Sequence, residues 1–369
     1  MSAKNGAVSS DDQSQSEHEP ASGAVKLTAV PDDGRMSEAN VGATFTTSAL
    51  LRPTAPSAAV QAALVEALIE EGMARFCWDH AGADADGIAS GADLIAASRS
   101  LFALGRGLES FVCPVPDDRA DVGYYRFAVN NPSGGLRKYQ DGMHRGLPLS
   151  GIWNHRAATN PHWFRLTDQQ RTFDRFVSAY TQVISAISAA FTACVDPPGR
   201  IESLVRTDGR TDGSYLRIIS SPGAPHRDQL TVGKDGLVSR HRAHVDTTVF
   251  VVQPPTLSAS TSGGRLRFLD HQRRWQPMHV EAGEFVVFTG RDFNAALGLT
   301  RSHKFVHEVV ATPEQATRDR LSAFFRIGVD PDAADVRTVG GGVFQTLNGM
   351  PVTTGADYYA AMTIHRATA

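Results

Sequence analysis

From about residue 214 onward, short apolar segments alternate with glycine-rich or polar links, and this pattern restricts the fold more than any other feature of the chain. The segments span 215–219, 247–253, 265–270, 284–290, 304–310 and 321–328. Each has the length of a β-strand, and a run of short strands with turn residues between them is typical of an antiparallel sandwich or barrel. We therefore predict that the second half of the chain is rich in β-structure.

The preceding part of the chain is predicted to be mainly helical. Ser57 can cap a first helix, and a second helix fits residues 92–104. The strongest helix begins at Thr167, where Thr167 and Gln170 have the spacing of a capping box. Residues 74–78 are predicted to form a short strand between the first two helices.

The first 45 residues are rich in Ser, Ala, Gly, Asp, Glu and Gln and have no apolar period. Such a segment cannot bury enough surface to offset its ordering entropy, so we predict a disordered tail. The expected organisation is a tail over 1–45, a helical N-terminal region over 46–200, and a β-rich domain with a C-terminal segment over 201–369.

Composition restricts the partners and the compartment. The net charge of −3 gives no long-range attraction to nucleic acid or to an anionic membrane, so we expect neither as a partner. No apolar run approaches the length that a membrane span needs, and the N-terminus lacks the apolar segment of a secretory signal. Three scattered cysteines fit a reducing compartment, so we expect a cytoplasmic protein. The oligomeric state is not indicated.

A candidate metal site is formed by His244, Asp246 and His307. His244 and Asp246 are two residues apart at the start of a strand signal, so both are expected to point to one face of the sheet. His307 lies in another strand-like segment and supplies a second imidazole. Two imidazoles and one carboxylate with open positions form the facial triad of non-haem iron(II) oxygenases, whereas catalytic zinc sites usually keep one open position.

Alternatives remain open at this site. A His-x-Asp pair also occurs in surface turns before a buried strand. His303 has the same strand parity as His307 and competes with it as the third ligand, although His307 lies deeper in the strand. His241 is expected to be a polar neighbour.

A second pair, Arg320 and Ser322, also lies two residues apart in a predicted strand. A guanidinium and a hydroxyl on one face can bind a carboxylate through charge-assisted hydrogen bonds. Such a pair meets the need of a dicarboxylate co-substrate.

With these segments in this order, the stretch from Leu216 to Ile327 resembles the 2-oxoglutarate/iron(II) oxygenases of the isopenicillin N synthase-like superfamily, which includes deacetoxycephalosporin C synthase. The match is carried by AHVDTTVFVV at 243–252, by 263–290, by SHKFVHEVV at 302–310 and by RLSAFFRIG at 320–328. The resemblance implies a double-stranded β-helix of the jelly-roll or cupin-like kind within an α+β fold. It also implies Fe(II), with 2-oxoglutarate and dioxygen as co-substrates, and ascorbate as a candidate further cofactor.

The resemblance implies roles for individual residues. His244, Asp246 and His307 would bind iron, and Arg320 and Ser322 would bind 2-oxoglutarate. Arg217 matches an arginine that some bacterial members place near the substrate or co-substrate carboxylate. Further candidates to line a substrate pocket are Phe250, Phe344 and the residues near Tyr358.

The implied activity is hydroxylation, desaturation or related C–H chemistry on a small molecule, and an antibiotic or other specialised metabolite is the expected context. The carboxylate of Asp246 argues against the related halogenases. One alternative is an oxidase of the same fold that does not use 2-oxoglutarate, as isopenicillin N synthase and the aminocyclopropane oxidases do not. Another is a binding protein without catalysis.

Overall fold

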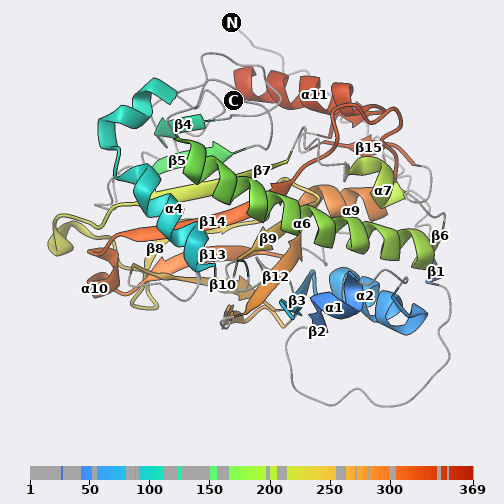
Figure 1. Cartoon of the computed structure of the whole chain (residues 1–369), viewed down its shortest axis with the longest axis horizontal. Helices are drawn as coiled ribbons and strands as arrows, with labels where there is room; N and C mark the ends of the chain where they lie inside the picture. The colour runs from blue at the N-terminus through green and yellow to red at the C-terminus, as the bar shows by residue number, and fades with distance from the viewer. Residues whose placement is uncertain are drawn as a thin grey trace, which may run out of the picture.

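Two β-sheets and a layer of helices make up the computed structural model, which is shown in Figure 1. The structure describes residues 26–27, 43–51, 56–79, 88, 91–111, 123–126, 150–155, 166–196, 200–205, 214–254, 263–270, 272–278, 280, 283–298, 305–338, 342–346 and 349–368.

The larger sheet has eight strands in the order β2-β3-β12-β9-β14-β7-β5-β4. All neighbours pair antiparallel except β2 and β3, which are parallel. The strands are β2 (Thr44–Thr46), β3 (Met73–Cys77), β4 (Gly123–Arg126), β5 (Gly151–His155), β7 (Tyr215–Ser221), β9 (Phe250–Gln253), β12 (Glu284–Thr289) and β14 (Arg320–Ile327).

The smaller sheet has four antiparallel strands in the order β11-β10-β13-β8. They are β8 (Val238–His244), β10 (Arg265–Leu269), β11 (Trp275–Pro277) and β13 (His307–Ala311). From β7 to β14 the chain passes repeatedly between the two sheets, with the consecutive strands β10 and β11 both in the smaller sheet.

A first apolar cluster lies between the two sheets. It joins Val286 and Phe288 of the larger sheet to Leu266, Phe268 and Val309 of the smaller one. Because successive side chains of a strand point to opposite faces, the alternate residues of β12, Phe285 and Val287, point to the other face of the sheet. The larger sheet therefore has two buried faces, one toward the smaller sheet and one toward the helices.

The helices cover the outer face of the larger sheet, and α6 crosses in front of it in Figure 1. The α-helices are α1 (Thr47–Leu50), α2 (Ala58–Glu70), α4 (Ala92–Phe102), α6 (Thr167–Cys194), α7 (Arg200–Leu204), α9 (Arg291–Leu297), α10 (Pro313–Ala316) and α11 (Gly355–Thr368). Two 3₁₀ turns, η1 (Gly105–Phe111) and η3 (Arg227–Gln229), and two short strand pairs, β1 (Lys26–Leu27) with β6 (Val195–Asp196) and β15 (Phe344–Gln345) with β16 (Pro351–Val352), complete the described elements.

One predicted helix start agrees with the structure and another does not. The Ser57 hydroxyl accepts a hydrogen bond from the Val60 amide and caps α2, as predicted. The predicted capping box at Thr167 is wrong, because Leu166 holds the cap position and Thr167 is already helical. A capping box instead begins α10, where Thr312 and Gln315 bond to each other's backbone amides.

Helix α6 is long and apolar enough to cross a membrane by length and composition alone. However, 61% of its most apolar window is buried inside the protein. Its apolar face includes Phe173, Phe176, Tyr180 and Ile187, which pack in the cluster between the helices and the sheet. We therefore describe α6 as the central core helix of the fold.

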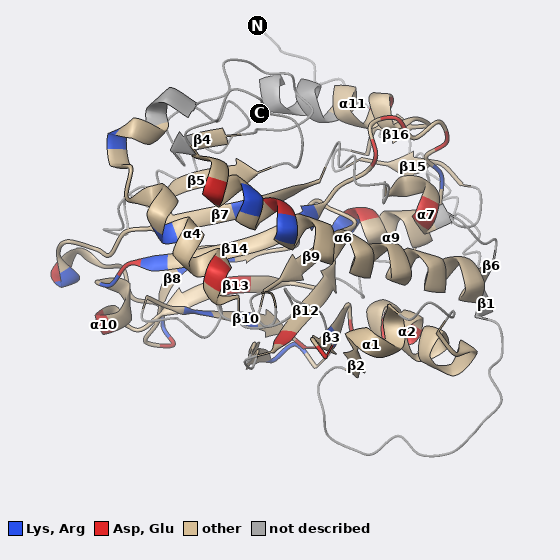
Figure 2. Ribbon diagram, in the orientation of Figure 1, with Lys and Arg blue, Asp and Glu red and all other residues tan. Residues whose placement is uncertain are grey.

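The predicted limits at 45 and 200 both fall inside described elements, β2 and α7. Within the predicted tail, Lys26–Leu27 pairs with β6, and β2 begins at Thr44, just before the expected limit at 45. Basic and acidic residues are interspersed along the described ribbon (Figure 2).

Candidate metal and co-substrate site

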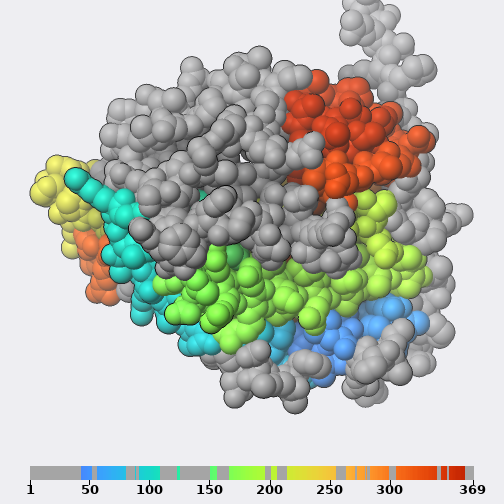
Figure 3. Space-filling model, turned by 45° about the horizontal axis from the view of Figure 1, so that its top comes forward, coloured from blue at the N-terminus to red at the C-terminus, as the bar shows by residue number. Residues whose placement is uncertain are grey.

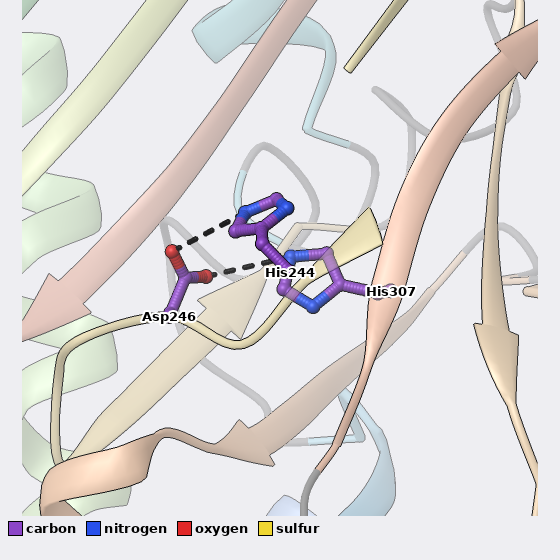
Figure 4. A group of neighbouring side chains, drawn as sticks. All are labelled: His244, Asp246 and His307. Carbon is purple, nitrogen blue, oxygen red and sulfur yellow. Dashed lines mark ion pairs between the residues drawn. The ribbon is translucent and has the colours of Figure 1, made fainter. Parts of the chain in front are cut away.

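Three side chains converge at one end of the smaller sheet, where β8 ends and β13 begins. Figure 4 shows His244, Asp246 and His307 pointing toward one another. One ligand atom from each lies within 4.8 Å of the other two. The Nε2 atom of His244 lies 3.7 Å from Asp246 Oδ1, and the Nε2 atom of His307 lies 3.5 Å from Asp246 Oδ2. The sequence therefore identified a group that the fold brings together.

The reason for this convergence differs from the one expected. His244 is the last residue of β8 and pairs directly with His307 of β13. Asp246 lies beyond the end of β8, in the turn that leads to β9, so strand parity does not orient it. Its backbone carbonyl accepts a 2.8 Å hydrogen bond from the Arg291 amide, which ties this turn to the start of α9. The turn, rather than the pleat of a strand, directs the carboxylate toward the two imidazoles.

Backbone carbonyls orient both imidazole rings. The Nδ1 atom of His244 lies 2.7 Å from the Arg242 carbonyl, and Nδ1 of His307 lies 3.4 Å from the Phe305 carbonyl. A carbonyl can only accept a hydrogen bond, so Nδ1 carries the proton in each ring and Nε2 keeps its lone pair. His241 stacks on the His244 ring with centroids 4.2 Å apart, which agrees with its prediction as a neighbour.

Charge favours the state of these groups that binds a metal. Burial by itself raises the pKa of Asp246, but Arg326, His244 and His307 outweigh it and hold that pKa well below its usual range. Arg326 Nη2 lies 3.7 Å from Asp246 Oδ1. Burial lowers the pKa of His307 to about 4, although Asp246 opposes this shift. At neutral pH the group therefore offers a carboxylate and an unprotonated imidazole.

This donor set fits a divalent transition metal. Two imidazole nitrogens and one carboxylate on one side of an ion leave the other side open, which is typical of mononuclear iron(II). All three side chains are mostly buried, with exposed fractions of 20%, 12% and 7% for His244, Asp246 and His307. His303 lies outside the described residues, so the choice between His303 and His307 stays a prediction from the sequence.

Arg320 and Ser322 point from β14 into the same space between the sheets. Alternate residues of β14 face the helices, as Ala323 and Phe325 do, whereas Phe324 packs with the cluster between the sheets. Arg320, Ser322 and Arg326 share the parity of Phe324. The predicted parity of the Arg320 and Ser322 pair is thus confirmed.

The Arg320 guanidinium is buried without an anionic partner in the described part of the chain. Its Nε atom has no hydrogen-bond partner there. Burial and the nearby Arg240 lower the pKa of Arg320 to about 10. Backbone carbonyls of Ala316 and Arg318 hold Arg240 at 2.8 and 2.7 Å, so Arg240 adds positive charge without neutralising Arg320. A buried cation in this setting calls for an anion.

The candidate substrate residues divide between the two faces of the larger sheet. Arg217 faces the space between the sheets, where its Nε atom donates a 2.9 Å hydrogen bond to Asn154 Oδ1 and its guanidinium lies 5.0 Å from the Tyr215 ring centre. Phe250, Phe344 and Tyr358 instead belong to the cluster on the helix side. The expectation that Phe250, Phe344 and residues near Tyr358 line the substrate pocket stays a prediction from the sequence.

Sequence reasoning missed Arg326. Its parity with Arg320 on β14 was available as a signal, but its contact with Asp246 depends on the turn after β8. Arg291, whose amide holds that turn, gave no signal in the sequence.

Comparisons with known proteins were made at the levels of sequence and structure. No protein-family model matches the chain, and no curated protein matches it in sequence. Solved structures do match. A protein of the 2OG-Fe(II) oxygenase family from Caulobacter crescentus is 18% identical, with a TM-score of 0.55, over 83% of this chain and 93% of that one. This chain has the fold of that oxygenase.

Two further structures support the same fold. A full-length Neurospora crassa protein in complex with alpha-KG and thymine is 13% identical, with a TM-score of 0.58, over 88% of this chain and 96% of that one. The dioxygenase for auxin oxidation in rice is 16% identical, with a TM-score of 0.52, over 88% of this chain and 95% of that one. The similarity spans the helical region as well as the sheets.

Proposed function

We propose that this chain is a 2-oxoglutarate-dependent non-haem iron(II) oxygenase with a jelly-roll core, of the isopenicillin N synthase-like superfamily. In this proposal His244, Asp246 and His307 bind Fe(II), and Arg320 with Ser322 binds the distal carboxylate of 2-oxoglutarate. The observation that carries it is the pairing of two sites in one interior: an imidazole and carboxylate group open on one side, and a buried guanidinium on β14 that has no anionic partner among the described residues.

The metal and its co-substrates would supply the activation of dioxygen and the oxidation of a C–H bond. The residues of the chain would supply orientation. The Arg242 and Phe305 carbonyls hold the two imidazoles with Nε2 inward, and Arg326 keeps the Asp246 carboxylate charged. Ser322, of which only 3% is exposed, keeps a hydroxyl beside Arg320 on the same face of β14.

The substrate is proposed to be a small molecule in specialised-metabolite or antibiotic biosynthesis, converted by hydroxylation, desaturation or a related reaction. Arg217 is the proposed substrate contact, since it faces the same interior beside Asn154. The proposal includes a cytoplasmic location, no nucleic-acid or membrane partner, and ascorbate as a further cofactor.

The test is an anaerobic titration of the metal-free protein with Fe(II) and then with 2-oxoglutarate, followed by a metabolite screen for substrate-stimulated succinate. Stoichiometric binding of both and succinate release are expected. Replacement of His244 by Ala should abolish iron binding and succinate release, and a His244→Ala protein with full turnover would disprove the triad assignment. Comparison of His303→Ala with His307→Ala decides the third ligand, since only the ligand variant should lose iron.

Two other functions use the same fold. An oxidase that does not consume 2-oxoglutarate would form product without stoichiometric succinate. A binding protein without catalysis would lack stoichiometric iron after purification without oxygen. Isopenicillin N synthase and the aminocyclopropane oxidases share the Arg-x-Ser pair, so the ratio of succinate to product, and not Arg320, separates 2-oxoglutarate use from the oxidase alternative.

A further inference from the structure

A second group of buried guanidinium atoms lies beside the candidate iron site. Its member on β14 is Arg326, near the other end of that strand from Arg320. Arg326 is six residues further along β14 than Arg320, which corresponds to about 20 Å between their backbone positions at the rise of an antiparallel strand. Arg326 is also the residue that contacts Asp246. The two arginines therefore lie at separate places in the interior.

Arg291 joins Arg326 at this place. It is the first residue of α9, and its amide bonds to the Asp246 carbonyl. Its side chain is 15% exposed, but both terminal nitrogens, Nη1 and Nη2, are buried and have no hydrogen-bond partner among the described residues. Among the described residues, Arg291 Nη2 approaches one carboxylate oxygen, Asp292 Oδ1, at 3.8 Å, which is too far for a hydrogen bond.

Arg326 is only partly satisfied. Its Nη1 atom donates to the Tyr215 hydroxyl at 3.0 Å, and Nη2 approaches Thr247 Oγ1 at 3.5 Å. Its Nε atom is buried and lacks a partner in the described part of the chain. Buried donors of this kind cost free energy unless a bound group accepts their hydrogen bonds.

Charge balance points in the same direction. Arg291 and Arg326 share one buried carboxylate, Asp292, whose Oδ2 atom already accepts a hydrogen bond from Tyr358. Asp246 also faces Arg326, but in the proposed enzyme its charge, together with that of the 2-oxoglutarate carboxylate bound to the metal, balances Fe(II). Among the described residues, one positive charge then remains in a buried setting, where an unmatched charge is strongly unfavourable.

We propose that the substrate presents an anionic group, most simply a carboxylate, to the guanidinium groups of Arg291 and Arg326. This inference rests on the proposed function, because it places the group beside the candidate iron site. It names an acidic small molecule as the substrate class. Planar guanidinium groups are well suited to a carboxylate, since they form paired charge-assisted hydrogen bonds with it.

The test uses formate as the smallest carboxylate probe and formamide as its neutral counterpart. Protein loaded with Mn(II) and 2-oxoglutarate is titrated with each, and binding is followed by the shift in Tm. Formate is expected to raise Tm more than formamide. The formate affinity should fall about ten-fold or more in Arg291→Met, as the loss of a hydrogen bond between charged groups predicts.

Arg265→Met is the matched control, because Arg265 is an exposed arginine of β10. It should bind formate as the wild-type protein does. Arg291→Lys, which keeps the charge, provides a milder variant if Arg291→Met does not fold, and it should bind formate with intermediate affinity. Equal formate shifts in the wild-type protein and both Arg291 variants, or equal shifts with formate and formamide, would overturn the proposal.

A separate arm distinguishes this proposal from the function on which it rests. Arg320→Met loaded with Mn(II) alone should keep the formate shift that depends on Arg291, although it loses 2-oxoglutarate. Failure of the wild-type protein to bind 2-oxoglutarate would overturn the proposed function. Loss of the formate shift in Arg320→Met would instead assign the anion site to Arg320 and overturn the present inference.

Discussion

The phenol of Tyr358 donates a 2.7 Å hydrogen bond to Asp292 Oδ2, and this bond connects α11 with α9. Both groups are buried. The neighbouring Tyr359 donates to the Val329 carbonyl at 2.8 Å, so the two tyrosines fasten α11 at two points. In Figure 3 the orange-red C-terminal residues lie beside yellow-green residues that include α7, where Asp330 bonds to the Leu204 carbonyl. The tyrosine pair thus anchors the C-terminal helix.

Replacement of Tyr358 by Phe should destabilise the protein by about 1–3 kcal/mol, because it leaves the buried Asp292 carboxyl with one donor fewer. Tyr359→Phe is the matched control. Its lost partner is a neutral carbonyl, so the expected cost is about 1 kcal/mol. Urea denaturation monitored by circular dichroism measures both values. A loss for Tyr358→Phe that does not exceed the loss for Tyr359→Phe would contradict a special role for the Asp292 contact.

The co-substrate site gives a second prediction. Arg320→Met should weaken 2-oxoglutarate binding about 10- to 100-fold, because it removes charge-assisted hydrogen bonds to a carboxylate. The 2-oxoglutarate affinity of Arg320→Lys should lie between those of the wild-type protein and Arg320→Met, since a lysine keeps the charge but cannot bind a carboxylate in a bidentate manner. Calorimetric titration of the Mn(II)-loaded protein measures the affinity. Arg318→Met, which alters an exposed side chain two residues away, should bind 2-oxoglutarate normally.

Strands with strong apolar alternation could be predicted from the sequence. The limits of β7, β10, β12 and β14 lie within about two residues of the predicted segments. Strand β8 was missed because it is an edge strand of the smaller sheet, and most of its residues are only partly buried. Its sequence from Val238 to His244 therefore carries no apolar pattern.

The metal group could be predicted because its residue types are rare in combination, even though the strand argument for Asp246 was wrong. The arginines near it could not be assigned from spacing. Arg291 reaches the site only because the turn after β8 bonds to the start of α9. Phe250 and Phe344 pack in the cluster on the helix side, and the sequence could not indicate this, because apolar residues have the same pattern on either face of a doubly buried sheet.

The metal-free protein should lose stability as the pH falls from about 6.5 to 4. Burial lowers the pKa of His307 to about 4 in the folded state, whereas an unfolded histidine titrates near 6.5. Between these values the unfolded chain binds a proton that the folded chain does not, so protonation favours unfolding. The contribution of His307 is at most about 3 kcal/mol.

Comparison with His307→Gln isolates this contribution, because glutamine does not titrate. Denaturation curves of both metal-free proteins at several pH values measure it. The wild-type protein should show the steeper pH dependence within this window. Asp246 also contributes below about pH 5, because its folded pKa lies below the unfolded value, so the two proteins are compared between about pH 6.5 and 5. Parallel stability curves for the two proteins would refute the buried, neutral state of His307.

Arg326 should set the lower pH limit of metal binding. Its guanidinium favours the charged form of Asp246, so Arg326→Met should raise the pKa of that carboxyl, and protons should then compete with the metal at higher pH. The acid midpoint of Fe(II) binding is expected to move up by about one to three pH units, the usual effect of a neighbouring opposite charge. Anaerobic Fe(II) titrations at a series of pH values measure this midpoint.

Tyr215→Phe is the matched control, because it removes the 3.0 Å hydrogen bond to Arg326 but leaves the charge in place. The midpoint of Tyr215→Phe should stay near the wild-type value. The midpoint of Arg326→Lys should lie closer to the wild-type value than that of Arg326→Met. Equal shifts of the midpoint in Tyr215→Phe and Arg326→Met would show that packing around Asp246, rather than the charge of Arg326, controls protonation of that carboxyl.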